Sequence, residues 1–89
     1  MTPFIKKPVM VHAIMWDGNL ATAEFISETC GKNIGITPDN KLLVHTLEGI
    51  MTADVGDWII RGVAGDFYPC KPEIFKETYE PHYARAHGY

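Results

Sequence analysis

Hydrophobic residues occupy nearly every position of the stretch "VMVHAIMW", residues 9–16, and His12 is its only polar member. A strand with one face in water alternates apolar and polar residues, whereas an unbroken apolar run is typical of a strand covered on both faces. We therefore predict a strand over residues 9–16 in the centre of a sheet. In that setting His12 is better interpreted as a hydrogen-bonded core histidine than as a catalytic one.

A helix is predicted over residues 20–30. Asn19 is a suitable N-cap, and Gly31 can end the helix in a left-handed conformation. Apolar residues at helical spacing form a stripe that should face the sheet: Leu20, Ala23, Ile26 and Cys30. Phe25 projects off this stripe, so it either covers an edge of the sheet or marks a contact surface.

The middle of the chain has the pattern of antiparallel strands and turns. A bend is expected at residues 38–40, and strands over residues 41–47 and 50–53 should be joined by a tight turn at Glu48-Gly49. Strands over residues 58–61 and 66–69 flank the turn 62–65, whose two glycines permit a second hairpin. Pro69 must lie at a strand end or in an edge strand, because it donates no ladder hydrogen bond.

The C-terminal part predicts a short helix over residues 72–76, because Pro72 suits the first helical position. A closing strand is expected over residues 78–83, and residues 84–89 resemble a loosely held tail. The whole chain, residues 1–89, is too short for two cores and forms a single domain. The fold class is α+β, built on a strongly bent antiparallel sheet; a small, partly open barrel is one form that such a sheet can take.

Charge and composition exclude several classes of function. The chain has 8 Lys and Arg residues against 11 Asp and Glu, a formal net charge of −3, which disfavours a nucleic-acid groove. No apolar run approaches the roughly 18 residues of a membrane helix, so we expect no membrane partner. The N-terminal segment leads to Trp-Asp-Gly rather than to a small-residue cleavage site, and we therefore expect a cytoplasmic protein.

Metal, cofactor and catalytic motifs are weak in this sequence. Cys30 and Cys70 lack metal-ligand spacing and are expected to be buried free thiols, and the turn 62–65 lacks the features of a phosphate loop. We therefore expect no metal and no cofactor. Cys70 could be a nucleophile only if the fold brought His12 or His82 to it.

Three acidic residues could still converge through the turns and form an acid/base or metal site: Asp54, Asp57 and Asp66. We favour the interpretation that Asp57 and Asp66 accept hydrogen bonds from turn amides.

Three blocks together resemble a family of small phage and prophage proteins: "KKPVMVHAIMWDG", "TLEGIMTADVGDWIIRGVAGDFYPCKPEIF" and "ETYEP". They cover about two thirds of the chain, and the second block is the most specific. Asp66 stands where the family pattern usually has Glu, and Glu73 where it usually has Asp, so one fixed carboxylate length is not essential there. The resemblance carries no catalytic residue that can be transferred to this chain.

The resemblance implies a phage-encoded, non-enzymatic accessory protein in the host cytosol. Such proteins bind and inhibit or sequester a host component, for example a defence complex or a signalling nucleotide. We expect a homo-oligomer, because a bent sheet of this size has few other ways to enlarge its buried area. For a nucleotide ligand, aromatic side chains and Arg61 at a subunit interface would form the cradle.

Two alternatives are a small enzyme that uses Cys70 or the carboxylates of Asp57 and Asp66, and a virion assembly component. Most of the distinctive residues of the second block have a role in folding. Six of its residues have no evident role of that kind and are the candidate binding residues: Asp57, Arg61, Asp66, Tyr68, Cys70 and Lys71.

Overall fold

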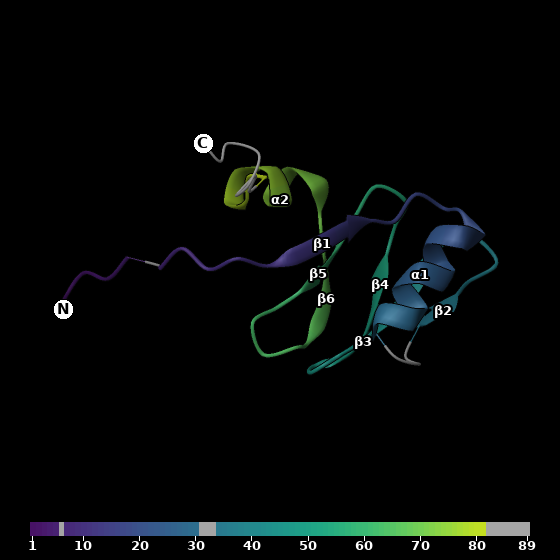
Figure 1. Ribbon diagram of the computed structural model, residues 1–89, viewed down its shortest axis with the longest axis horizontal. Coiled ribbons are helices and arrows are strands. Elements are labelled where there is room, and N and C mark those ends of the chain that lie inside the picture. Colours follow the sequence, from purple (N-terminus) through teal and green to yellow (C-terminus); the bar gives the residue numbers. More distant parts are fainter. Residues whose placement is uncertain (6, 31–33, 82–89) are drawn as a thin grey trace, which may run out of the picture.

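The computed structural model describes residues 1–5, 7–30 and 34–81, and in this part of the chain it has two helices and two three-stranded antiparallel sheets (Figure 1). One sheet has the strand order β1-β5-β6 and the other β2-β3-β4. The elements, in chain order, are β1 (His12–Met15), α1 (Leu20–Cys30), β2 (Ile34–Ile36), β3 (Leu42–Thr46), β4 (Gly49–Ala53), β5 (Trp58–Arg61), β6 (Phe67–Cys70) and α2 (Pro72–Thr78). The predicted α+β class is confirmed, and the sheets do not close into a barrel.

The hydrophobic core lies where the two sheets and α1 meet. β6 packs against β3 and β4, and α1 packs against β2. The buried side chains come from both sheets and from α1: Trp16, Ala23, Ile26, Leu42, Val44, Ala53 and Ile59. Burial of each large apolar side chain among them contributes about 1.5–3 kcal/mol to folding, so this small cluster is the main source of stability.

Trp16 ties three distant segments together. Its side chain is fully buried, and its Nε1 donates a hydrogen bond to the carbonyl oxygen of Asn40 at 3.0 Å. Its backbone N–H donates to the Asp57 carbonyl at 2.8 Å, and its own carbonyl accepts from Gly56 at 2.7 Å. The end of β1 is thereby joined to the turns that precede β3 and β5.

Helix α1 has the predicted bounds, but its N-terminal contacts differ from the prediction. Asp17, rather than the side chain of Asn19, makes them: Asp17 Oδ1 accepts from the Asn19 N–H at 3.0 Å and Oδ2 accepts from the Thr22 hydroxyl at 2.9 Å. Ala23 and Ile26 are buried as expected, whereas Leu20 is 66% exposed. The predicted stop at Gly31 lies outside the described residues.

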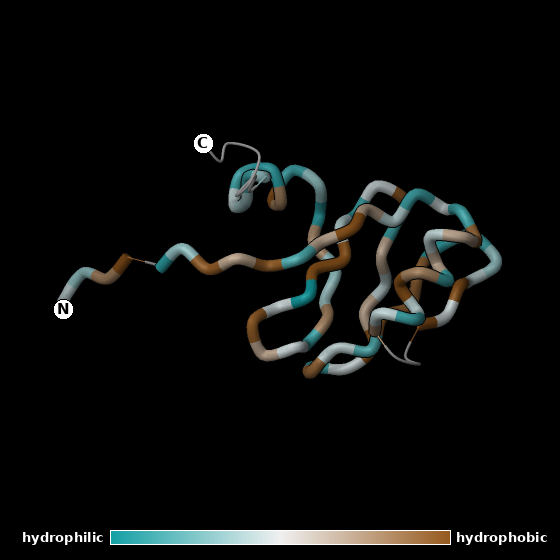
Figure 2. Tube along the Cα trace, in the orientation of Figure 1, coloured by the Kyte–Doolittle hydropathy of each residue, from teal (hydrophilic) through white to brown (hydrophobic). Residues whose placement is uncertain are grey.

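The prediction of a central, two-sided strand over residues 9–16 is wrong for the single chain. β1 covers only His12–Met15 and lies at the edge of its sheet, and His12 is exposed rather than a core histidine. β5 takes the centre instead, because its hairpin with β6 leaves its other edge free for β1. Residues 1–5 and 7–11 extend away from the body as an arm with apolar stretches (Figure 2), in which Phe4 and Ile5 are 91% and 92% exposed.

The structure differs from the prediction at two further places, both next to turns. Residues 34–36 form the short strand β2, which pairs with β3, although their neighbours favour turns. The turn between β3 and β4 is Leu47-Glu48, because Thr46 pairs with Gly49. Gly49 therefore has its positive φ of 114° directly after the turn rather than within it.

The second hairpin is close to the prediction. β5 has the predicted bounds, β6 is displaced by one residue, and Pro69 lies in an edge strand as expected. The predicted bend at residues 38–40 is also present, with Asn40 at a φ of 68°.

Helix α2 begins at Pro72 as predicted but continues to Thr78. The predicted closing strand is therefore wrong at residues 78–81, and the rest of it and the predicted tail lie outside the described residues. Stacking holds α2 in place: the rings of Phe75 and Trp58 are 4.3 Å apart and nearly parallel, and Tyr79 lies 5.1 Å from Phe75. A short helix that stacks on Trp58 of β5 thus stands where a closing strand was expected.

Candidate functional site

The six candidate residues do not form one site. Asp57 and Lys71 meet at the start of β5, whereas Asp66 lies at the other end of the β5–β6 hairpin. The side chains of Tyr68 and Cys70, two positions apart in β6, lie on the same face of the sheet. Arg61 and its cross-strand neighbour Phe67 lie on the opposite face. The three carboxylates considered as an acid/base or metal site are therefore split, since Asp66 is remote from the other two.

Asp57 is a buried carboxylate with a structural role. Its Oδ2 accepts a hydrogen bond from the backbone N–H of Asp54 at 2.9 Å and one from the Lys71 ammonium at 3.0 Å. The first of these contacts confirms the prediction that Asp57 accepts a turn amide. With both partners in place, the carboxylate is held in one position and its negative charge is paired with the ammonium of Lys71.

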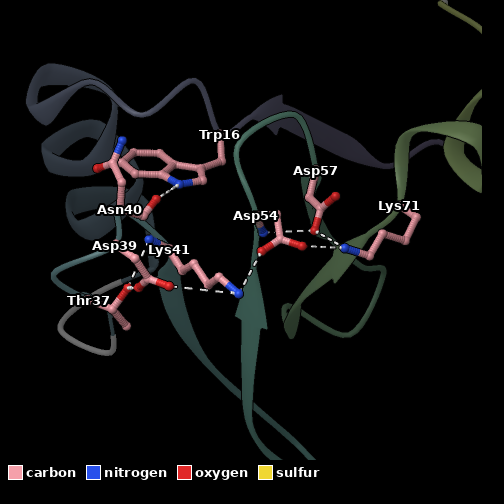
Figure 3. A network of polar contacts seen from close by, with 8 residues as sticks. All are labelled: Trp16, Thr37, Asp39, Asn40, Lys41, Asp54, Asp57 and Lys71. Carbon is pink, nitrogen blue, oxygen red and sulfur yellow. Dashed lines mark hydrogen bonds and ion pairs between the residues drawn. The ribbon is translucent and has the colours of Figure 1, made fainter.

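Ion pairs continue from Asp57 across the surface (Figure 3). The Lys71 ammonium also lies 2.8 Å from Asp54 Oδ2, and Lys41 Nζ lies 3.4 Å from Asp54 Oδ1 and 3.9 Å from Asp39 Oδ2. The hydrogen bond from Lys71 is the main cause that lowers the pKa of Asp54. The same bond is the main cause that raises the pKa of Lys71. These charges stabilise one another and are poorly placed for proton transfer.

Asp66 and Tyr68 crowd the turn of the second hairpin. A Cβ placed on Gly62 would lie 2.8 Å from Asp66 Oδ1 and 3.2 Å from Tyr68 Cε1, so a larger residue there would have to displace these two side chains. Burial, followed by interactions with the Tyr79 hydroxyl, raises the pKa of Tyr68 to about 12. The phenol is therefore a neutral hydrogen-bonding group that contacts the segment after α2.

Cys70 is a free, half-buried thiol. Burial, and then the negative charges of Asp57 and Glu73, raise its pKa. His12 does not reach it, because His12 pairs with Arg61 at one end of the sheet, whereas Cys70 pairs with Trp58 at the other end and on the opposite face. His82 lies outside the described residues.

A pocket of about 350 Å³ opens beside Arg61, between α1 and the β1-β5-β6 sheet. Ile14, Phe25, Ile59 and Phe67 supply apolar walls, and His12 and Arg61 supply polar groups. The remaining lining residues are Ala13, Ile26, Thr29 and Cys30. The pocket has the size and the mixture of apolar walls and few polar groups that small-ligand sites have.

Cys30 connects this pocket to a second hollow. The second hollow has a volume of about 310 Å³ and shares Cys30 and Phe67 with the first. Its polar lining includes His45 and Asp66. Burial raises the pKa of the Cys30 thiol to about 11, although the nearby charge of Arg61 acts in the opposite direction. Cys30 is thus an apolar wall residue, and Arg61 is the principal positive charge of the pocket.

Most of the pocket was not predicted from the sequence, because its residues come from α1, β1, β5 and β6. The available signal was Phe25, which is 55% exposed and leans off the buried stripe into the pocket lining. Arg61 was a candidate, but its neighbours on the pocket wall were not. His12 was considered only as a core or catalytic residue.

Residues 1–5, 7–30 and 34–81 contain no cluster of three or more side chains suited to hold a metal ion. Neither helix in those ranges is long and apolar enough to span a bilayer.

Comparisons with protein-family models, with curated proteins and with solved structures gave no match for this chain.

Proposed function

We propose that this protein acts by binding rather than by catalysis, as a phage-encoded accessory protein that sequesters a small component of the host cytoplasm in the pocket beside Arg61. The resemblance of its three sequence blocks to phage proteins supports the origin and the host target. The observation that carries the binding site is the pocket itself, with Arg61 and His12 beside apolar walls.

The chemistry of the pocket favours a ligand with one flat apolar part and one anionic part. Phe25 and Phe67 can contact an aromatic ring, and the guanidinium of Arg61 can make paired hydrogen bonds to a phosphate or carboxylate. A nucleotide combines these two parts. The pocket of about 350 Å³ lies at the small end of the usual range for ligand sites, which fits a mononucleotide-sized fragment.

The residues considered for catalysis lack the activation that an enzyme would need. The negative charge of Asp57 is paired with the ammonium of Lys71, and burial raises the pKa of Cys70, which lowers its reactivity as a nucleophile. An enzyme would need an activated group at the pocket, and these residues have the opposite character.

Titration calorimetry with AMP, GMP and cyclic AMP tests this proposal. We expect at least one of the three to bind, and Arg61→Ala to weaken its binding by about tenfold or more, the value of a charge-assisted hydrogen bond. Arg61→Lys keeps the charge but loses the paired geometry and should be intermediate. Lys76→Ala, on exposed α2, is the matched control. No binding by any of the three, or equal losses in the Arg61 and Lys76 variants, would contradict the proposal.

A host protein is the second candidate target, and one specific surface favours it. At the tip of the β3–β4 hairpin, Leu47 and Ile50 are 83% and 62% exposed. Large exposed apolar side chains at one hairpin tip can form part of a protein contact. In host cells that carry the protein, loss of the phenotype in Leu47→Glu but not in Arg61→Ala would identify this hairpin, rather than the pocket, as the functional surface.

A further inference from the structure

The outer edge of β1 has free backbone hydrogen-bonding groups. Trp16 directs both its N–H and its carbonyl toward the β5 side, and peptide groups alternate in direction along a strand. Ile14 and His12 therefore also face β5, whereas Met15 and Ala13 present their N–H and carbonyl groups outward. In the described part of the chain no strand lies along this edge.

This edge lacks the features by which proteins protect edge strands. Charged side chains, prolines and bulges usually prevent a sheet edge from pairing with another chain. Residues 9–16 contain no charge and no proline, and Val9, Met10 and Met15 are 50%, 64% and 42% exposed. By contrast, the opposite edge strand β6 contains Pro69 and packs against β3 and β4. The β1 edge is therefore suited to pair with another strand.

We propose that two copies of the chain pair through their β1 edges, antiparallel about a twofold axis at His12, and so form one continuous six-stranded sheet. The sequence of residues 9–16 is typical of a strand in the interior of a sheet, yet in the single chain β1 is an edge strand with β5 as its hydrogen-bonded neighbour. A second copy supplies the other neighbour. The contact is self-complementary, as the interface of a symmetric dimer must be.

The register about His12 follows from the residues that it aligns. Val9 faces the partner's Met15, and Val11 faces the partner's Ala13, so small and large apolar side chains meet in pairs. Lys7 faces the partner's Asp17, which pairs opposite charges. Pro8 falls at a position whose missing N–H would point away from the partner strand, so it does not interrupt the new ladder.

The N-terminal arm supplies surface for this interface. A stable dimer buries roughly 800 Å² of each partner, more than a four-residue strand can provide. The arm runs out from β1 (Figure 1), and its Phe4 and Ile5 side chains are more than nine-tenths exposed in the single chain. In the dimer residues 9–11 of the arm lie along the partner's β1, and Phe4 and Ile5 fall just beyond its end.

The dimer does not depend on the proposed ligand, but it changes the pocket. His12 and Arg61 are cross-strand neighbours on the pocket side of the sheet. Across the axis the same face continues with the partner's His12 and the partner's Arg61. The two pockets then flank one row of basic side chains, which would place Arg61 near a subunit interface.

The oligomeric state and the exchange of individual amides test this proposal with the full chain. Analytical ultracentrifugation at about 100 μM should show a dimer, and hydrogen exchange by NMR should show the Ala13 and Met15 amides protected in the dimer. These amides face away from β5, so folding of one chain alone does not protect them. A monomer at this concentration, or a dimer in which both amides exchange freely, would overturn the proposal.

Two pairs of variants test the edge and the register. Ala13→Pro removes an outward N–H and should weaken the dimer by about tenfold or more, whereas Leu20→Pro, at the proline-tolerant first position of α1, should leave it unchanged. His12→Cys should form an intermolecular disulfide, because residues facing each other on the axis have Cα atoms about 4.5 Å apart. Ala21→Cys should not exceed the wild-type background from Cys30 and Cys70. Equal dimerisation of the two proline variants, or no cross-link in His12→Cys, would refute the pairing.

Discussion

The ammonium of Lys71 lies 3.0 Å from Oδ2 of Asp57, and the side chain of Asp57 is only 4% exposed. This pair joins the residue before α2 to the turn before β5, fourteen positions earlier in the chain. It explains why both residues stand in the most distinctive block of the sequence without forming a reactive site: they connect the last helix to the sheet.

Asp57→Ala should lower the free energy of unfolding by about 2 kcal/mol, because the partly buried N–H of Asp54 loses its acceptor and the ammonium of Lys71 loses one of its two carboxylate partners. Urea denaturation measures this loss. Asp66→Ala is the matched control, since Asp66 lies at the opposite, more open end of the hairpin, and we expect a smaller effect there. Equal losses in the two variants would show that burial of Asp57 is not the cause.

Acid should destabilise the protein through three carboxylates. The pKa values of Asp17, Asp39 and Asp54 lie below their ordinary 3.8, chiefly because of hydrogen bonds from the Asn19 N–H, the Thr37 hydroxyl and Lys71 respectively. Because the folded values are lowered, the stabilisation is complete above the ordinary value and is lost as the pH falls through the folded values.

The melting temperature should therefore be nearly constant down to about pH 5 and fall steeply between about pH 4 and pH 2. Lys71→Ala removes the main cause of the lowered pKa of Asp54 and should therefore make the fall in melting temperature with pH shallower. An unchanged slope in Lys71→Ala would show that Asp54 does not contribute to the acid transition.

The sequence was sufficient where local signals determine structure. α1 and β5 have their predicted bounds, because a helical stripe and a compact apolar strand between turns need no knowledge of distant residues. The location of β1 required such knowledge: an apolar run predicts a strand but does not say which strands pair with it or whether it lies at the edge of the sheet. β2 was missed because its three residues become a strand only through pairing with β3.

The candidate site was predicted in part for the same reason. Arg61 lines the pocket, but its partners Phe25 and His12 come from other elements, so their convergence depends on sheet register and helix placement. The contact of Lys71 with Asp57 likewise depends on how α2 returns to the sheet. Sequence spacing alone carries no such information.

Trp16→Phe should destabilise the protein more than Trp58→Phe. Trp16 is fully buried and donates its Nε1 hydrogen to Asn40, so the change removes a buried hydrogen bond and leaves a small cavity, at a cost of about 2 kcal/mol. Trp58 stacks on Phe75, and phenylalanine can keep that contact. Guanidinium denaturation of both variants provides the comparison, and a larger loss in Trp58→Phe would contradict this account of the core.

Phe75→Ala should release α2 from the sheet while the core stays folded. The Phe75 ring stacks on Trp58 at 4.3 Å, and α2 has no fully buried residue, so this stack is its main apolar attachment beside the Lys71–Asp57 ion pair. Amide exchange in α2 should accelerate strongly, with little change in β3. Ile74→Ala, an exposed neighbour on the same helix, is the control and should leave exchange in α2 nearly unchanged. Uniform acceleration throughout the protein would instead indicate global destabilisation.

Cys30 should react slowly with alkylating reagents, and Arg61 should set part of that rate. Burial raises the pKa of the Cys30 thiol to about 11, so at pH 8 only about one thiol in a thousand is ionised. We expect alkylation by iodoacetamide, measured by mass spectrometry, to be about two orders of magnitude slower in the folded than in the urea-unfolded protein. Arg61→Ala removes the charge that favours the thiolate and should slow the reaction further, whereas Lys76→Ala should not. Faster alkylation of Cys30 in Arg61→Ala would mean that the side chain of Arg61 covers the thiol rather than acting on it through its charge.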